Sequence, residues 1–176
     1  VGMAKEFIEN FSESKEVFDV ASAALGIDLP QLCMHGPSET LNRTENTQPA
    51  ILAASIAILR PLERRGLSAE AAAGHSLGEY TAITAAGGFE LKDAITLVQK
   101  RGRYMQEAMP EGAGLMAAIL GMDRTALEKT CLEAAKNGIV APANYNSPGQ
   151  IVIAGERPAV EKAMELAKAA GAKKVV

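Results

Sequence analysis

Residues 71–80 read AAAGHSLGEY, and this decapeptide determines more of the expected architecture than any other part of the chain. Its centre, 74–78, has the G-x-S-x-G spacing of a nucleophile elbow, in which a serine occupies a sharp turn between a strand and a helix. Glycine is expected on both sides of Ser76 because neighbouring backbone comes so close that a β-carbon would clash. Such a turn places the serine hydroxyl beside the first free N–H groups of the next helix, where an oxyanion would form. The same spacing also arises by chance in glycine-rich chains, so the rest of the sequence decides its meaning.

The composition indicates a globular protein with one domain or two small ones. The 176 residues are 48% hydrophobic and 22% charged, and the net charge of -3 argues against a nucleic-acid-binding surface. Cys33 and Cys131 lie far apart without C-x-x-C spacing, which predicts buried thiols rather than a disulfide framework or a zinc site. The longest apolar stretch, 51–59, is too short to span a bilayer and no signal peptide opens the chain, so we expect a cytoplasmic protein.

Apolar periodicity and capping residues predict that the first part of the chain is mostly helical. The expected helices span 3–11, 15–25, 48–65, 77–86 and 91–108, and the stretch after Gly26 is expected to hold loop and short helical turns. Ser14 is expected to cap the second helix, and Thr47 with Pro49 to begin the third. Residues 50–59 are apolar almost all round, as in a helix buried between layers. A strand over 70–73 is expected to enter the elbow, against the local helix propensity.

Arg101 is the second informative residue. Leu97 and Met105 lie four residues away on either side, so helical periodicity places Arg101 on an apolar face. A guanidinium on such a face needs an anion. It could form a buried ion pair, extend to the surface, or clamp a substrate carboxylate with two hydrogen bonds, and the helix pattern leaves all three open.

The pattern changes after a flexible joint predicted at 110–114. Strands are expected over 115–121, 139–144 and 150–154 and from 173 onward, with helices over 123–137 and 158–170. This βαββαβ order is that of the split-βαβ, ferredoxin-like arrangement.

Five blocks of sequence are informative when taken together and in order: TQPA at 47–50, GHSLGEY at 74–80, RGRYMQ at 101–106, Pro-Glu-Gly at 110–112 and NYNSPGQ at 144–150. Together these blocks resemble the malonyl-CoA:acyl-carrier-protein transacylase family. The resemblance covers essentially the whole chain. It implies an α/β fold, with a hydrolase-like parallel-sheet core rich in helices and an inserted ferredoxin-like (βαββαβ) small subdomain. Residues 1–112 would belong to the catalytic core and 113–176 to the subdomain.

The resemblance also implies a reaction and its residues. Ser76 would attack the thioester of malonyl-CoA and hold the malonyl group as an ester until the phosphopantetheine thiol of acyl carrier protein removes it, for fatty-acid biosynthesis. The backbone N–H of Leu77 would donate to the oxyanion, and Arg101 would bind the free malonyl carboxylate. Met105 would line the pocket and Asn146 would lie near the acyl group, although a core methionine and a turn residue remain equally open readings. No metal or organic cofactor is implied, and we expect a monomer that binds neither nucleic acid nor membrane.

Two expected parts have no counterpart in this sequence. The family has a glycine- and glutamine-rich loop that supplies a second oxyanion donor, and a catalytic histidine after the small subdomain, so we expect these residues to be part of a longer enzyme. His75 is expected to be a poor base, because it is adjacent to the serine on an extended segment and points away from it. His35 lies in an early loop, and both are expected to be structural or solvent-facing histidines. A serine esterase or thioesterase, an acyltransferase domain of a polyketide synthase and a non-catalytic fragment that docks a carrier protein remain alternatives.

Overall fold

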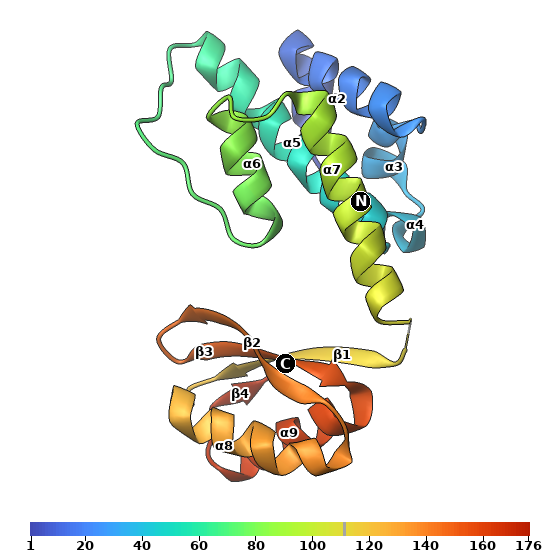
Figure 1. Ribbon diagram of the computed structural model, residues 1–176. Coiled ribbons are helices and arrows are strands. Elements are labelled where there is room, and N and C mark those ends of the chain that lie inside the picture. The colour runs from blue at the N-terminus through green and yellow to red at the C-terminus, as the bar shows by residue number, and fades with distance from the viewer. Residues whose placement is uncertain (111) are drawn as a thin grey trace. The chain divides into compact units, whose positions relative to one another are not determined.

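The chain forms two units, Val1–Ala108 and Met109–Val176. They are seen in a computed structural model that describes residues 1–110 and 112–176 (Figure 1). The predicted joint at 110–114 includes Glu111, which lies outside the described residues. The first unit is helical and the second combines two helices with a small antiparallel sheet, which makes the protein a mixed α/β structure.

The regular elements of residues 1–108 are helices. They are α1 (Lys5–Asn10), α2 (Ser12–Leu25), α3 (Leu29–His35), α4 (Ser38–Asn42), α5 (Thr44–Arg64), α6 (Leu77–Ala85) and α7 (Leu91–Ala108). The five helices predicted from periodicity are confirmed as α1, α2, α5, α6 and α7, with small differences at their ends. The short helices α3 and α4 occupy the stretch expected to hold loop and helical turns.

Helix α5 forms the centre of the first unit. Its small and apolar side chains Leu52, Ala53, Ile56 and Ala57 are fully buried and belong to the same core as residues of α2 and α7. The prediction that this helix is buried all round is wrong on one side. Exposed apolar side chains on α5 are Ile51 (40%), Ile58 (37%) and Leu62 (41%). One apolar face of α5 is therefore left uncovered by the described residues.

The two predicted helix caps are wrong. Helices α2 and α5 both begin earlier than expected, so Ser14 and Thr47 lie inside them. The buried hydroxyl of Ser14 donates to the carbonyl of Ala57 at 2.6 Å, and the hydroxyl of Thr47 donates to the carbonyl of Leu41 at 2.6 Å. Both hydroxyls bond carbonyls of other elements, a use that competes with capping and that local sequence does not reveal.

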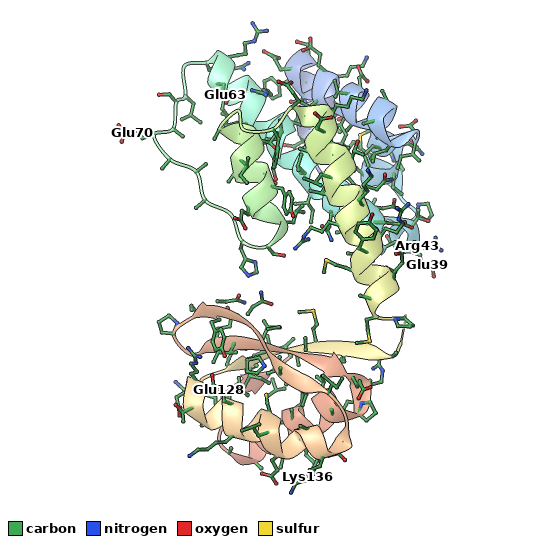
Figure 2. All side chains as sticks on the ribbon, in the orientation of Figure 1. Glu39, Arg43, Glu63, Glu70, Glu128 and Lys136 are labelled. Carbon is green, nitrogen blue, oxygen red and sulfur yellow. The ribbon has the colours of Figure 1, made fainter. Side chains whose placement is uncertain are left out.

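The predicted strand at 70–73 is not formed. Residues 67–76 form an exposed connection between α5 and α6, and Figure 2 shows Glu70 pointing outward from it. A strand needs a hydrogen-bonded neighbour, and the one sheet found in the described residues belongs to the second unit. The predicted parallel sheet is likewise not present in residues 1–110 and 112–176, where every strand pair is antiparallel.

The second unit has the predicted β-α-β-β-α-β order. Its elements are β1 (Gly114–Leu120), α8 (Arg124–Ala134), the 3-10 turn η1 (Ala135–Asn137), β2 (Val140–Ser147), β3 (Gln150–Glu156), α9 (Arg157–Ala169) and β4 (Lys174–Val175). The sheet order is β2-β3-β1-β4. Both helices lie on the same face of the sheet (Figure 1), and the buried side chains Ala117, Ile119, Ile151 and Ile153 of β1 and β3 share a core with them.

The two cysteines are buried free thiols, as predicted. Burial raises the pKa of the Cys33 thiol to about 11 and also raises the pKa of the Cys131 thiol. Within the described part of the chain, no three or more His, Cys, Asp or Glu side chains are grouped so that they could hold a metal ion. A membrane-spanning length of apolar residues is not found in any one described helix, and only α2 and α3 taken as a pair, bent by 111°, pass such a test.

Candidate active site

Ser76 lies where the exposed connection meets α6, as the residue before the first helical position. Its backbone angles are φ 55° and ψ -114°, a combination that costs energy for any residue with a β-carbon. Its side chain makes no capping hydrogen bond to the helix. The sharp turn predicted from the motif is therefore present, although the strand before it is not.

The two glycines of the motif have different roles. A β-carbon on Gly74 would lie 1.9 Å from the carbonyl carbon and oxygen of Gly78, so this position requires glycine. A β-carbon on Gly78 would meet nothing within 4 Å among the described atoms. The expectation that both glycines avoid a clash is thus correct for Gly74 and wrong for Gly78, which supplies the helical backbone that Gly74 approaches.

Three backbone N–H groups at the N-terminus of α6 lie next to Ser76, and two of them are already engaged. The N–H of Gly78 donates to the carbonyl of His75 at 2.8 Å, and the N–H of Glu79 donates to the carbonyl of Ser76 at 3.2 Å. Leu77 occupies the first helical position, where an N–H has no acceptor within the helix. The N–H of Leu77 can therefore serve an oxyanion beside Ser76, supported by the helix dipole.

Arg101, on α7, is half-buried and reaches the serine. Its Nη2 donates to Oγ of Ser76 at 3.1 Å, and its guanidinium carbon lies 5.6 Å from the ring centroid of Tyr80. Its Nη1 donates to the side-chain oxygen of Gln48. None of the ion pairs formed by described residues involves Arg101, so the alternative of a buried ion pair has no partner among them.

Gln48 is a site residue to which the sequence analysis gave no role. It lies on α5 and is only 5% exposed. Its Oε1 accepts from Arg101 and its Nε2 donates to Sδ of Met105 at 3.3 Å. Helices α5 and α7 approach closely here, since a β-carbon on Gly102 would lie 2.5 Å from the carbonyl oxygen of Thr44. The sequence did contain a signal for Gln48, because its amide stands alone at the start of the apolar run 49–54. Its role could not be predicted, since its partners lie on another helix.

The remaining candidates divide between the units. Met105 is 48% exposed and bonded to Gln48, so it is not a core methionine. Asn146 belongs to the second unit, where it is an exposed residue of β2 beside the turn at 148–149 rather than a residue of that turn. The structure thus groups Ser76, Leu77, Arg101 and Met105 in the first unit. Both histidines are exposed.

An open pocket of about 400 Å³ lies between the exposed connection and two helices. It is lined by Ala72, Ala73 and Gly74, by Gly78, Thr81, Ala82 and Ala85 of α6, and by Ile51, Ser55 and Leu59 of α5. The hydroxyl oxygen of Thr81 is buried without a hydrogen-bond partner among the described residues. The pocket joins the uncovered face of α5 to the segment that enters the serine turn.

Comparison with known proteins gives consistent results. A family model described as "Acyl transferase domain" matches residues 2–176. The malonyl CoA-acyl carrier protein transacylases of Escherichia coli (strain K12) and Bacillus subtilis (strain 168) are 51% and 47% identical to this chain over its full length. An acyl carrier protein S-malonyltransferase from Vibrio cholerae superposes with a TM-score of 0.92 at 50% identity, covering 100% of this chain and 58% of that one. A malonyl-transacylase solved in complex with a type II PKS acyl-carrier protein gives a TM-score of 0.94 at 49% identity, covering 100% of this chain and 57% of that one. The chain spans 57% and 56% of the length of the two curated relatives.

Proposed function

The chain belongs to the acyl transferase domain family, and on that premise we propose that it forms part of a malonyl-CoA:acyl-carrier-protein transacylase. The observation that carries the proposal is the 3.1 Å hydrogen bond from Arg101 to Oγ of Ser76 at the N-terminus of α6. It places a cation that can bind a carboxylate beside a hydroxyl that can form an ester, which is what the transfer of a malonyl group requires.

The proposed reaction has two halves. Oγ of Ser76 attacks the thioester carbonyl of malonyl-CoA, its proton passes to a base, and the carbon–sulfur bond breaks to release coenzyme A as the thiol. The phosphopantetheine thiol of acyl carrier protein then attacks the malonyl ester and regenerates the serine hydroxyl. The Leu77 N–H stabilises the oxyanion in both halves. We assign the base to a histidine outside residues 1–176, in line with the family resemblance.

The proposed basis of selectivity is the charge of Arg101. A malonyl group carries a free carboxylate that can accept two hydrogen bonds from the guanidinium, whereas an acetyl group leaves this half-buried cation unpaired. Met105, one turn further along α7, is proposed to line the acyl pocket. A role of Asn146 near the bound acyl group stays a prediction from the family resemblance. No cofactor takes part, and the cytoplasm, which holds the thioester substrates, is the proposed location.

We further propose that the first unit is part of a hydrolase-like core. The support is the uncovered apolar face of α5, at Ile51, Ile58 and Leu62, together with the exposed connection over 67–76. Strands pairing with that connection would cover this face and occupy the adjoining pocket, which is the packing of a sheet on a helix. The second unit, with sheet order 4-1-3-2 by strand number, fits a ferredoxin-like subdomain. The division into 1–112 and 113–176 stays a prediction.

The test is a mass measurement on the full-length protein. Incubation with malonyl-CoA is expected to add one malonyl group to Ser76, and addition of acyl carrier protein is expected to remove it. The Ser76→Ala variant serves as the control and should acquire no adduct. Rapid release of free malonic acid would instead support a hydrolase, and no adduct on the native protein would support a docking role. Residues 1–176 alone are expected to turn over poorly.

A further inference from the structure

We propose that Gln48 positions Arg101 for the malonyl carboxylate and thereby sets the selectivity for a charged acyl group. This inference rests on the function proposed above and deepens it. Gln48 is buried on α5. The oxygen of its side-chain amide contacts the guanidinium of Arg101, and the amide nitrogen contacts the thioether of Met105. It therefore connects the two residues of α7 that are proposed to meet the acyl group.

The chemistry of the partners determines which way the amide faces. A guanidinium has only donors, so the amide must turn its oxygen towards Arg101. The amide nitrogen then faces Sδ of Met105, at 3.3 Å. A thioether is a weak acceptor. The nitrogen end of this nearly buried amide is therefore poorly satisfied, which is an unfavourable arrangement if Gln48 served only stability.

A neutral partner is what a substrate-binding arginine requires. A carboxylate at position 48 would hold the guanidinium equally well but would neutralise it, and the malonyl carboxylate would have to compete with it. The amide oxygen of Gln48 instead fixes Nη1 while the positive charge stays uncompensated by the described residues. The second amino group, Nη2, is then directed at Ser76. Gln48 thus orients the cation without lowering its affinity for an anion.

The position of Gln48 makes this orientation rigid. Its helix is held against α7 at the close approach of Gly102 to Thr44, only one residue from Arg101. The 5% exposure of Gln48 leaves its side chain little room to move. Because Arg101 itself is long and only half-buried, its guanidinium depends on such a fixed partner to remain near Ser76.

The main test replaces Gln48 by methionine, which keeps the length and shape of the side chain and removes both hydrogen bonds. In the full-length protein, Gln48→Met is expected to lower the rate of malonyl-ester formation on Ser76 by about ten- to a hundredfold. The rate of acetyl-ester formation from acetyl-CoA should change by less than about threefold, since acetyl transfer does not use the carboxylate contact. An equal loss for both substrates, or no loss for either, would overturn the proposal.

Ser14→Ala is the matched control. Ser14 is fully buried and bonds the same helix, through the carbonyl of Ala57, so its loss tests whether a weakened α5 is enough to change selectivity. It should lower the melting temperature while leaving the ratio of malonyl to acetyl rates unchanged. If Ser14→Ala shifts this ratio as much as Gln48→Met does, Gln48 has only a structural role.

Gln48→Glu gives a second, opposite test. The new carboxylate should occupy the guanidinium, so that malonyl loading is lost and acetyl loading is retained. Unchanged malonyl loading in this variant would contradict the inference. Native protein that forms no malonyl ester at all would instead contradict the proposed function, so the two failures are distinguishable.

Discussion

Arg101 is the residue on which the proposed selectivity depends. Leu97 and Met105, on the same predicted apolar face, are 40% and 48% exposed, so this face is not the buried side of α7. Arg101 itself is half-buried, and helical periodicity left three uses of its charge open. Its contacts with Ser76, Gln48 and Tyr80 include no described carboxylate, which separates it from an ordinary buried ion pair. The partner Gln48 was not predictable, because it lies more than fifty positions earlier in the chain and on another helix.

Replacement of Arg101 by alanine should lower malonyl transfer much more than acetyl transfer, and so reduce the selectivity for malonyl groups. We expect Arg101→Ala to lower kcat/KM for malonyl transfer by about a hundredfold, the effect of losing a bidentate hydrogen bond to a charged group. Acetyl transfer should fall far less. Steady-state rates with both thioesters measure this, and Arg103→Ala, which removes an exposed ion pair with Glu107 on the same helix, should leave both rates unchanged. Equal losses for the two substrates in Arg101→Ala would show that Arg101 does not bind the acyl carboxylate.

The glycines around Ser76 give a matched pair of variants. Gly74→Ala places a β-carbon 1.9 Å from the backbone of Gly78, so the turn must open and Ser76 must move. A shift of about 1 Å is enough to reduce ester formation by roughly a hundredfold. Gly78→Ala meets open space and lies within a helix, so it should be tolerated. Adduct formation by mass spectrometry compares the two, and similar losses in both would contradict this account of the turn.

The site depends on the contact between two helices, α5 and α7. The first carries Gln48 and the second carries Arg101 and Met105, and the two helices are brought together at Gly102. The existence of both helices was predictable from their long apolar patterns. The start of α5 was not, because the helix begins at Thr44, before the predicted cap at Thr47. The contact between the two helices was not predictable either, since nothing in either helix states which one it faces.

Gly102→Ala tests this contact. In an isolated helix, alanine would be more favourable than glycine by about 1 kcal/mol. Here the β-carbon would lie 2.5 Å from the carbonyl oxygen of Thr44, so we expect a net loss of stability of about 1–3 kcal/mol. Urea unfolding of this variant and of the exposed-site control Gln106→Ala gives the comparison. A more stable Gly102→Ala protein would show that the helices can separate without cost.

The strand predicted at 70–73 does not form, for a different physical reason. A helix satisfies its own backbone hydrogen bonds, so it forms from local sequence, whereas a strand exists only when another segment pairs with it. The strands of the second unit have their partners within residues 112–176 and were predicted correctly. The segment at 70–73 has none among the described residues, which is why the motif identified the turn but not its surroundings.

At the scale of the whole molecule, each unit has a core of its own. The second unit buries Ile119, Leu127, Ile153 and Val160 within itself. Its βαββαβ order could be derived from sequence because each turn is marked by glycine or proline. The order of the elements in this unit is therefore indicated by local sequence signals. The role proposed for Asn146 depends on three-dimensional placement, which local signals do not specify.

We expect the segment 109–176 to fold by itself. Its four strands form one sheet and its helices cover one face, although a unit of this size is only marginally stable. Thermal unfolding followed by circular dichroism should be cooperative. Ile153→Ala, which empties a fully buried site at the centre of β3, should remove about 2–5 kcal/mol and abolish the transition. A native segment without a cooperative transition would show that it needs the rest of the chain.

The backbone of Ser76 has a consequence for how this protein would respond to selection in the laboratory. Its φ of 55° costs the folded state roughly 1–3 kcal/mol, and glycine would largely avoid this cost. Glycine also makes the unfolded chain more flexible, which lowers the stability of the folded state by a smaller amount, about 1 kcal/mol. Ser76→Gly should thus melt at a higher temperature than the native protein while forming no acyl ester. Selection for thermal stability alone would therefore favour glycine at position 76 and yield an inactive protein. Selection for both stability and turnover would be needed to retain Ser76.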